Sequence, residues 1–182
     1  MTIDAQPPLT ILPCEERHMA EIAAIYADAV VHGTASFELD PPGVAEMTSR
    51  WQALTGAGFP YLVAEIGGCV AGYAYAGAYR ARPAYRATVE SSVYVHSGRR
   101  GQGIGRVLML ALIERCEALG FRQLIANVGD SANSASLQLH LSVGFEIAGT
   151  LKSVGWKHGR WLDTVLMQRP LGEGDTQPAG SK

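Results

Sequence analysis

The segment VESSVYVHSGRRGQGIGRVLMLALIERC, Val89 to Cys116, joins three kinds of local pattern without a break. An apolar run predicts a strand, a loop of arginines and glycines follows it, and apolar residues at helical spacing then predict a helix. Glycines allow the backbone to approach a ligand closely, and the first N–H groups of a helix favour an anion. The segment therefore predicts an anion-binding turn, although a plain glycine turn that caps a helix fits the same residues.

The spacing of the glycines separates the ligand classes that use such loops. No GxxxxGK[ST] P-loop is present, and the GxGxG of Gly101 to Gly105 differs from the GxGxxG of dinucleotide sites, which also opens a βαβ unit. The pattern [QR]-x-x-G-x-[GA] is filled from Arg100 to Gly105, and in this respect the chain resembles the GCN5-related N-acetyltransferases, the GNAT family. Three further stretches, ASFE, YRARPAYRATVESSVYV and GWKHGRWLD, resemble the phosphinothricin and methionine sulfoximine acetyltransferase branch in order and spacing.

Composition bounds the possible classes of protein. The chain has 182 residues, a formal charge of −2 and 47% hydrophobic residues, so we expect a globular protein without a nucleic-acid partner. No apolar run approaches the roughly 20 residues of a membrane span, and the first residues lack the pattern of a signal peptide. We therefore expect no membrane partner and a cytoplasmic location. The histidines show no metal-ligand spacing, so we expect no metal, and the three cysteines are interpreted as reduced core thiols.

The order of local patterns predicts the fold class. We expect an α/β protein with a mixed sheet and helices on both faces. The resemblance implies the GNAT acyl-CoA N-acyltransferase fold, with a central twisted, mostly antiparallel sheet in a single domain over residues 9–170. We expect residues 1–8 and 171–182 to be flexible, because the tail from Pro170 has few apolar residues to pack. The predicted elements are a strand at LTILP, helices at 15–32, from Pro41 to GAG, and at 103–119, hairpin strands at YLVAEI and CVAGYAYAG, strands at 88–96 and LIANVG, a short helix within 132–145, and a last hairpin that turns at His158-Gly159.

The resemblance implies a site for acetyl-CoA as cosubstrate. Backbone amides of the strand beyond a bulge hold the thioester and the pantetheine arm, and an asparagine of a later motif contacts the same arm. In this chain these roles fall on Val93, Tyr94, Val95 and Asn133. The alternative for Asn133 is a helix N-cap, which is compatible with contact to the ligand. The residues expected at the pyrophosphate are Arg100, Gly101, Gln102, Gly103, Ile104, Gly105 and Arg106.

Two residues are candidates for proton transfer. An amine must lose its proton before it attacks a thioester, and Glu90 comes shortly before the amides that hold that thioester. The alternative for Glu90 is a solvated strand end or an ion pair. His140 stands where the family's motif has a tyrosine that protonates the departing thiolate. A histidine can supply that proton, and a helix-packing histidine is the alternative.

The acceptor requires recognition as well. Guanidinium groups match carboxylate and phosphinate oxygens, so Arg80 and Arg82 with Tyr85 are interpreted as acceptor-binding rather than as a solvent-facing basic loop. The resemblance places Ser91 and Ser92 in the same pocket. It also suggests Phe37 as a pocket wall, with core packing as the alternative, and Lys157 as a partner of the substrate carboxylate, with a solvated hairpin tip as the alternative.

These residues together predict an enzyme. We expect transfer of the acetyl group of acetyl-CoA to the amino group of a small amino-acid-like substrate by direct attack, and a homodimer by resemblance. A transferase for another small amine is the alternative within this chemistry. A non-catalytic acyl-CoA-binding sensor is the alternative from another class of protein. Glu90 and the loop that carries Arg80, Arg82 and Tyr85, the arginine loop, argue against a sensor, because a sensor needs neither a base nor an acceptor pocket. A dehydrogenase is disfavoured by the glycine spacing.

Overall fold

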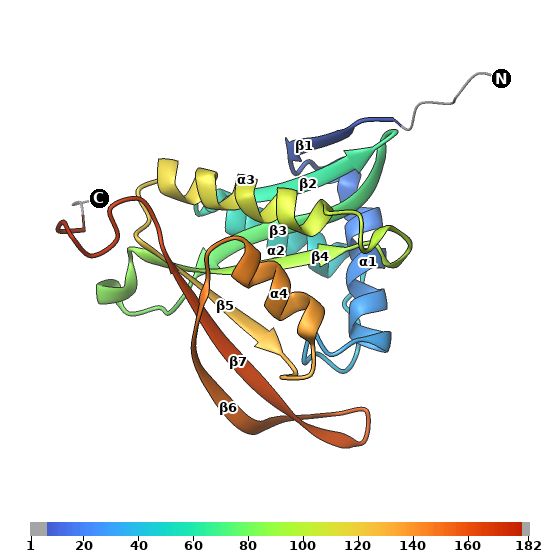
Figure 1. Ribbon diagram of the computed structural model, residues 1–182. Coiled ribbons are helices and arrows are strands. Elements are labelled where there is room, and N and C mark those ends of the chain that lie inside the picture. Colours follow the sequence, from blue (N-terminus) through green and yellow to red (C-terminus); the bar gives the residue numbers. More distant parts are fainter. Residues whose placement is uncertain (1–6, 180–182) are drawn as a thin grey trace.

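The computed structural model describes residues 7–179 as one seven-stranded sheet with helices on both faces (Figure 1). The order across the sheet is β1-β2-β3-β4-β5-β7-β6, and β4 pairs with β5 in parallel while the other pairs are antiparallel. The elements are β1 (Leu9–Pro13), α1 (Met19–His32), α2 (Val44–Gly56), β2 (Tyr61–Ile66), β3 (Cys69–Ala78), β4 (Thr88–Val95), α3 (Ile104–Ala118), β5 (Gln123–Gly129), α4 (Ser134–Ser142), β6 (Glu146–Lys157) and β7 (Arg160–Pro170).

The sheet separates two apolar cores. α3 and α4 cover one face, and Leu108, Met109 and Leu112 of α3 are fully buried there against β3, β4 and β5. α1 and α2 cover the other face, where α1 packs against tyrosines of β2 and β3. The rings of Tyr61 and Tyr73 stack there with their centroids 5.8 Å apart. Burial of these faces is the main favourable term that holds the layers together.

The two central strands separate part of the way along their length. β4 pairs with β3 continuously from Val89 to Val95, but its parallel pairing with β5 ends at Ser91, opposite Ala126. Beyond that point β5 pairs only with β7, and β4 and β5 diverge (Figure 1). The resemblance implied a bulge in this strand, whereas the β3–β4 register is regular. The opening between β4 and β5 arises from the early end of their pairing.

The phase of the β3–β4 ladder decides which amides of β4 face this opening. The Tyr79 N–H donates to Thr88 O, and the His96 N–H donates to Ala71 O. N–H groups alternate in direction along an antiparallel strand. The amide of Tyr94 therefore points toward β3, and the amides of Val93 and Val95 point toward the opening. Of the three residues expected to bind the cosubstrate through their backbone, Tyr94 is therefore wrongly assigned in that role.

The predicted elements are confirmed in order and type, with differences at their ends. The first helix begins as a 3-10 turn, and the α-helix starts at Met19. The expectation that the tail from Pro170 does not pack is wrong at its first residues. Pro170 ends β7, and Leu171 is fully buried with its N–H donating to Arg122 O. One leucine is enough to extend the core by a residue.

One of the three cysteines expected in the core is exposed. Cys14 and Cys116 are buried free thiols as expected, but Cys69 is exposed at the first position of β3, beside the Gly67–Gly68 turn. A residue beside a hairpin turn has no sheet neighbour beyond it to cover its side chain.

Candidate active site

A groove of about 760 Å³ runs from the Gly101–Gly105 loop to the opening between β4 and β5. Gly101 and Gly103 adopt φ values of +76° and +78°, a conformation that other residues rarely take, so both glycines are required for the turn. Arg99, Arg100 and Arg106 line the same groove. Gln102 is exposed and does not line it.

The beginning of α3 supplies unpaired backbone donors to this groove. The first N–H bond of the helix runs from Val107 to Gly103 O, so the amides of Ile104, Gly105 and Arg106 have no partner within the helix. These amides and the helix dipole favour an anion, and Arg106 adds a full positive charge. Gly105 is buried, and a Cβ there would come 3.1 Å from Leu139 of α4, so its small size permits the close approach of the two helices.

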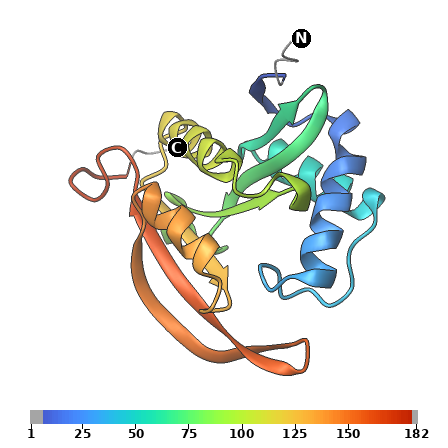
Figure 2. The ribbon, with the colours of Figure 1, turned by 45° about the vertical axis from the view of Figure 1, so that its right-hand side comes forward.

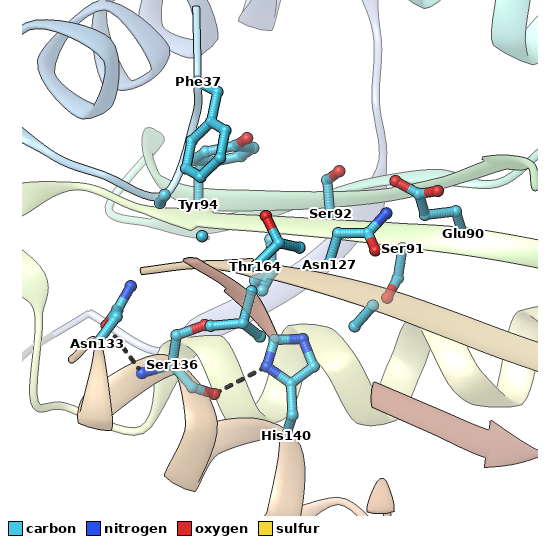
Figure 3. Close-up of a pocket in the computed structure, with 15 residues that line it drawn as sticks. Phe37, Glu90, Ser91, Ser92, Tyr94, Asn127, Asn133, Ser136, His140 and Thr164 are labelled. Atoms are coloured by element: carbon cyan, nitrogen blue, oxygen red, sulfur yellow. Dashed lines mark hydrogen bonds between the residues drawn. The ribbon is translucent and has the colours of Figure 1, made fainter. Parts of the chain in front are cut away.

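A second cavity, of about 250 Å³, adjoins the groove and contains the candidate proton-transfer residues (Figure 3). Glu90 and His140 both line it. Residues that line both cavities mark where they meet, and these are Ala35, Val93, Tyr94, Asn133 and Ser136. The two spaces therefore join at the opening between β4 and β5.

The two faces of the sheet each contribute one wall of this second cavity. Side chains alternate along a strand, so Glu90, Ser92 and Tyr94 of β4 share one face, and Tyr94 packs against the α1 core. Figure 3 shows Phe37 above Tyr94 on this side and His140 on α4 at the opposite side. The cavity thus passes through the sheet, with the carboxylate and the imidazole on opposite walls.

The tautomer of His140 follows from its hydrogen bond. Its Nδ1 lies 2.8 Å from Ser136 O, and because a carbonyl can only accept, Nδ1 carries the proton. Burial lowers the pKa of His140, so the ring is neutral at pH 7 and Nε2 has no hydrogen. Phe145 packs edge-on against the ring, with 5.1 Å between the centroids. In this state the imidazole accepts a proton or a hydrogen bond through Nε2 and cannot donate one there.

The buried His140 predicts an acid-sensitive fold. Its folded-state pKa lies below the ordinary value of 6.5, so the unfolded chain binds the proton more tightly, and stability is lost as pH falls below about 6.5. We expect the free energy of unfolding to decrease less between pH 7 and pH 5 in His140→Gln than in the parent protein, measured by urea unfolding. Between pH 8 and pH 7 the free energy of unfolding should change by the same amount in His140→Gln and in the parent protein. An equal decrease down to pH 5 would contradict the assignment.

Asn133 combines the two roles considered for it. Its Oδ1 accepts the Ser136 N–H at 3.2 Å and caps α4, which leaves the amide nitrogen free toward both cavities that it lines. Ser91 is buried, and its hydroxyl donates to Ile125 O. Ser92 hydrogen-bonds to Tyr75. All three line the cavity with Glu90.

Polar residues that the sequence analysis did not single out as site residues also line this cavity. Asn127 is placed there because it follows the last paired position of β5, where the strand turns away from β4. Thr164 of β7 pairs with Gly129, two residues after Asn127 on β5, and Ser136 lies one turn before His140. The amide inside the apolar run LIANVG was the one available signal, whereas Thr164 had none, since its position depends on pairing between distant strands.

The arginine loop lies outside both cavities. Arg80 stacks over the ring of Tyr79 at 5.1 Å and lies 6.0 Å from that of Tyr85, which orders the guanidinium without a carboxylate partner. Arg82 and Tyr85 belong to the exposed turn that leads into β4. Glu90 contributes to the raised pKa of Arg80, although the largest cause is its bond to Tyr79.

The structure does not bring Lys157 to either cavity. Its side chain is buried, and Nζ donates to Ser36 O at 2.7 Å. Phe37, the next residue, does line the cavity with Glu90. Within residues 7–179, no helix has the length and apolarity to cross a bilayer, and no three His, Cys, Asp or Glu side chains are grouped to hold a metal.

Comparison with known proteins identifies the class. The model of the acetyltransferase (GNAT) family matches residues 22–145. A phosphinothricin N-acetyltransferase of Alcaligenes faecalis is 58% identical over 92% of this chain and 85% of its own length. An L-methionine sulfoximine/L-methionine sulfone acetyltransferase of Pseudomonas paraeruginosa is 44% identical over 82% of this chain and 87% of its own length.

The solved structures agree with this result. A GNAT superfamily phosphinothricin acetyltransferase from Sinorhizobium meliloti, in complex with acetyl-CoA, superposes with a TM-score of 0.92. It is 46% identical and covers 95% of this chain and 94% of its own. The chain belongs to the GNAT family of acetyltransferases. The resemblance and the fold class predicted from the sequence are confirmed.

Proposed function

We infer that the protein transfers the acetyl group of acetyl-CoA to the amino group of a small amino-acid-like acceptor of the phosphinothricin or methionine sulfoximine and sulfone type. The names of its relatives support this substrate class. The observation that carries the proposal is the junction of the two cavities at the opening between β4 and β5, with Glu90 on one side of the junction and the glycine loop on the other.

The groove suits acetyl-CoA along its length. The pyrophosphate binds the amides of Ile104, Gly105 and Arg106, with the guanidinium groups of Arg100 and Arg106 beside it. The pantetheine arm lies in the opening and bonds to the amides of Val93 and Val95, which the sheet leaves unpaired on that side. The free amide nitrogen of Asn133 donates to the same arm.

Glu90 acts as the general base in the second cavity, on one side of the point where the cavities join. It takes a proton from the acceptor ammonium, directly or through water, and the neutral nitrogen attacks the thioester carbonyl carbon. The carbon–nitrogen bond forms, the carbon–sulfur bond breaks, and CoA leaves as a thiolate. The attacking nitrogen must lose a second proton to become an amide, and the thiolate must gain one. Because the His140 tautomer has no proton on Nε2, a water molecule that Nε2 orients relays this proton from the nitrogen to the thiolate.

The arginine loop recognises the second polar group of the acceptor. Arg80, Arg82 and Tyr85 precede β4, so an acceptor whose amine lies at Glu90 extends its far end toward them. Ser91, Ser92 and Phe37 form the near walls. The test is a panel in which methionine is compared with its sulfone and sulfoximine. A lower KM for the oxidised forms is expected, and equal KM values across the panel would remove the arginine loop from acceptor binding.

A homodimer joined through β6 accompanies this function. β6 is an edge strand of the sheet, and exposed apolar side chains lie along the β6–β7 hairpin. Among them are Trp156 and Trp161, whose ring centroids are 5.2 Å apart. Pairing of β6 with β6 of a second copy about a two-fold axis covers both the edge and the rings. Light scattering should give twice the chain mass for the parent and the single mass for Trp156→Glu/Trp161→Glu. A monomeric parent would contradict the dimer.

We also place the enzyme in the cytoplasm, as one catalytic domain over residues 9–170. Acetyl-CoA is an intracellular cosubstrate, and all three cysteines are free thiols.

A further inference from the structure

The tip of the β6–β7 hairpin is fastened to the loop between α1 and α2. Lys157 donates to Ser36 O at 2.7 Å, and His158 Nε2 lies 3.1 Å from Gly33 O. Figure 2 shows the hairpin tip beside this loop, although more than a hundred residues separate them in the sequence. Two contacts from the tip, at Gly33 and at Ser36, therefore hold the segment that leads into Phe37.

The ring of Phe37 lies on two glycines. A Cβ at Gly155 of β6 would come 2.4 Å from Phe37 Cε2, and a Cβ at Gly129 of β5 would come 2.9 Å from Cε1. No side chain larger than hydrogen fits at Gly155 while the ring stays in place. At Gly129 the backbone oxygen of Thr34, 2.3 Å from such a Cβ, excludes a side chain as well. This glycine seat, formed by Gly129 and Gly155, fixes one face of the ring, and the ring lines the cavity with Glu90.

A bulge in β6 aims Gly155 at the ring. The β6–β7 register shifts between Leu151 and Gly155, and Ser153 adopts a φ of +52° within the shift. Asp163 of β7 stabilises this conformation by accepting the Ser153 N–H at 3.0 Å and the Lys152 ammonium at 2.9 Å. The bulge is therefore a built feature of the hairpin.

The Lys157 contact is a strong one. The side chain is 4% exposed, and a buried ammonium is stable only with a close acceptor, which Ser36 O provides. Glu38, two residues further along the loop, adds a favourable charge, and its carboxylate accepts from Tyr26 and Arg50. The loop is thus held from the hairpin at Ser36 and from α1 and α2 at Glu38.

We propose that Lys157 is a positioning residue for acceptor specificity. It holds Ser36, and through it the Phe37 ring, against the glycine seat, and so limits the length of the acceptor side chain that fits between the ring and Glu90. The proposal rests on the acetyltransferase function inferred above. Lys157 touches no reacting atom, and its effect passes through Phe37.

The test compares Lys157→Met, Phe37→Ala and the double variant. For Lys157→Met we expect the preference in kcat/KM for methionine sulfone over the bulkier phenylalanine to narrow by about tenfold, the scale of a pocket-wall contact. The affinity for acetyl-CoA should be unchanged by calorimetry. Because the lysine acts through the ring, the double variant should show no further loss of preference beyond Phe37→Ala. Arg115→Met, which removes an exposed positive charge on α3 away from the hairpin, is the control for charge.

The outcomes are separable. An unchanged preference in Lys157→Met, or losses that add fully in the double variant, would overturn the proposal. If Lys157→Met does not fold, Lys157→Gln keeps an N–H donor of shorter reach, and the same two criteria apply to it. If the parent protein acetylates no acceptor of the panel, the inferred function fails and not the positioning role.

Discussion

Glu90→Gln should lower kcat at pH 7 by about 10²- to 10⁴-fold, the usual contribution of a general base. The amide keeps the size of the side chain but cannot accept a proton at neutral pH. The deficit should shrink as pH rises, because a growing fraction of the acceptor arrives already neutral. Steady-state rates from pH 6 to pH 10 with one acceptor measure both effects.

Two controls accompany this variant. Acetyl-CoA affinity should be retained, since the amides of Val93 and Val95 are backbone groups that the change does not touch. Glu114→Gln, at an exposed position on α3, should leave the rates unchanged. A near-normal kcat at pH 7 in folded Glu90→Gln would remove Glu90 from the mechanism. A uniform loss at every pH with a raised acceptor KM would make it an ammonium-binding group instead.

Arg100→Glu/Arg106→Glu should weaken acetyl-CoA binding by at least about 100-fold. Each charge-assisted hydrogen bond contributes about 1.5–3 kcal/mol, and a tenfold change in Kd corresponds to about 1.4 kcal/mol. The new carboxylates also repel the pyrophosphate at the end of a helix dipole that favours anions. Isothermal titration with acetyl-CoA measures the change.

The control for this variant is Arg115→Glu, an exposed reversal of charge near the other end of α3. It should bind acetyl-CoA almost normally, because solvent screens charges beyond about 10 Å. Thermal unfolding checks the fold of the double variant, because it also loses the ion pair between the Arg100 guanidinium and the Asp28 carboxylate, which lie 3.4 Å apart. An unchanged Kd in the folded double variant would mean that the phosphates bind elsewhere.

Local sequence patterns were sufficient for the order and type of the elements. Helical spacing, glycine turns and the Gly101–Gly105 loop depend on neighbouring residues, and these expectations agree with the structure. The opening between β4 and β5 was not predictable in the same way. It depends on where two strands stop pairing, and nothing in Ser91 or Ala126 alone marks that point.

The candidate site shows the same division. Glu90 and His140 were predicted from their positions around motifs, and both line one cavity. Lys157 was expected to reach the acceptor, but it is buried against Ser36 O, 121 positions away in the sequence. The glycine seat under Phe37 was also missed, because Gly155 reads as part of a hairpin until the bulge aims it at the ring.

Release of the CoA thiol from acetyl-CoA, followed with and without methionine sulfone, tests the central claim most directly. The parent protein should release thiol at a substantial rate only when the acceptor is present, and the acceptor should carry the acetyl group on its α-amino nitrogen in equal amount. Tight binding of acetyl-CoA with no acceptor-dependent release across the amino-acid panel would contradict the account. The chain would then be an acyl-CoA-binding module and not a transferase for this class of acceptor.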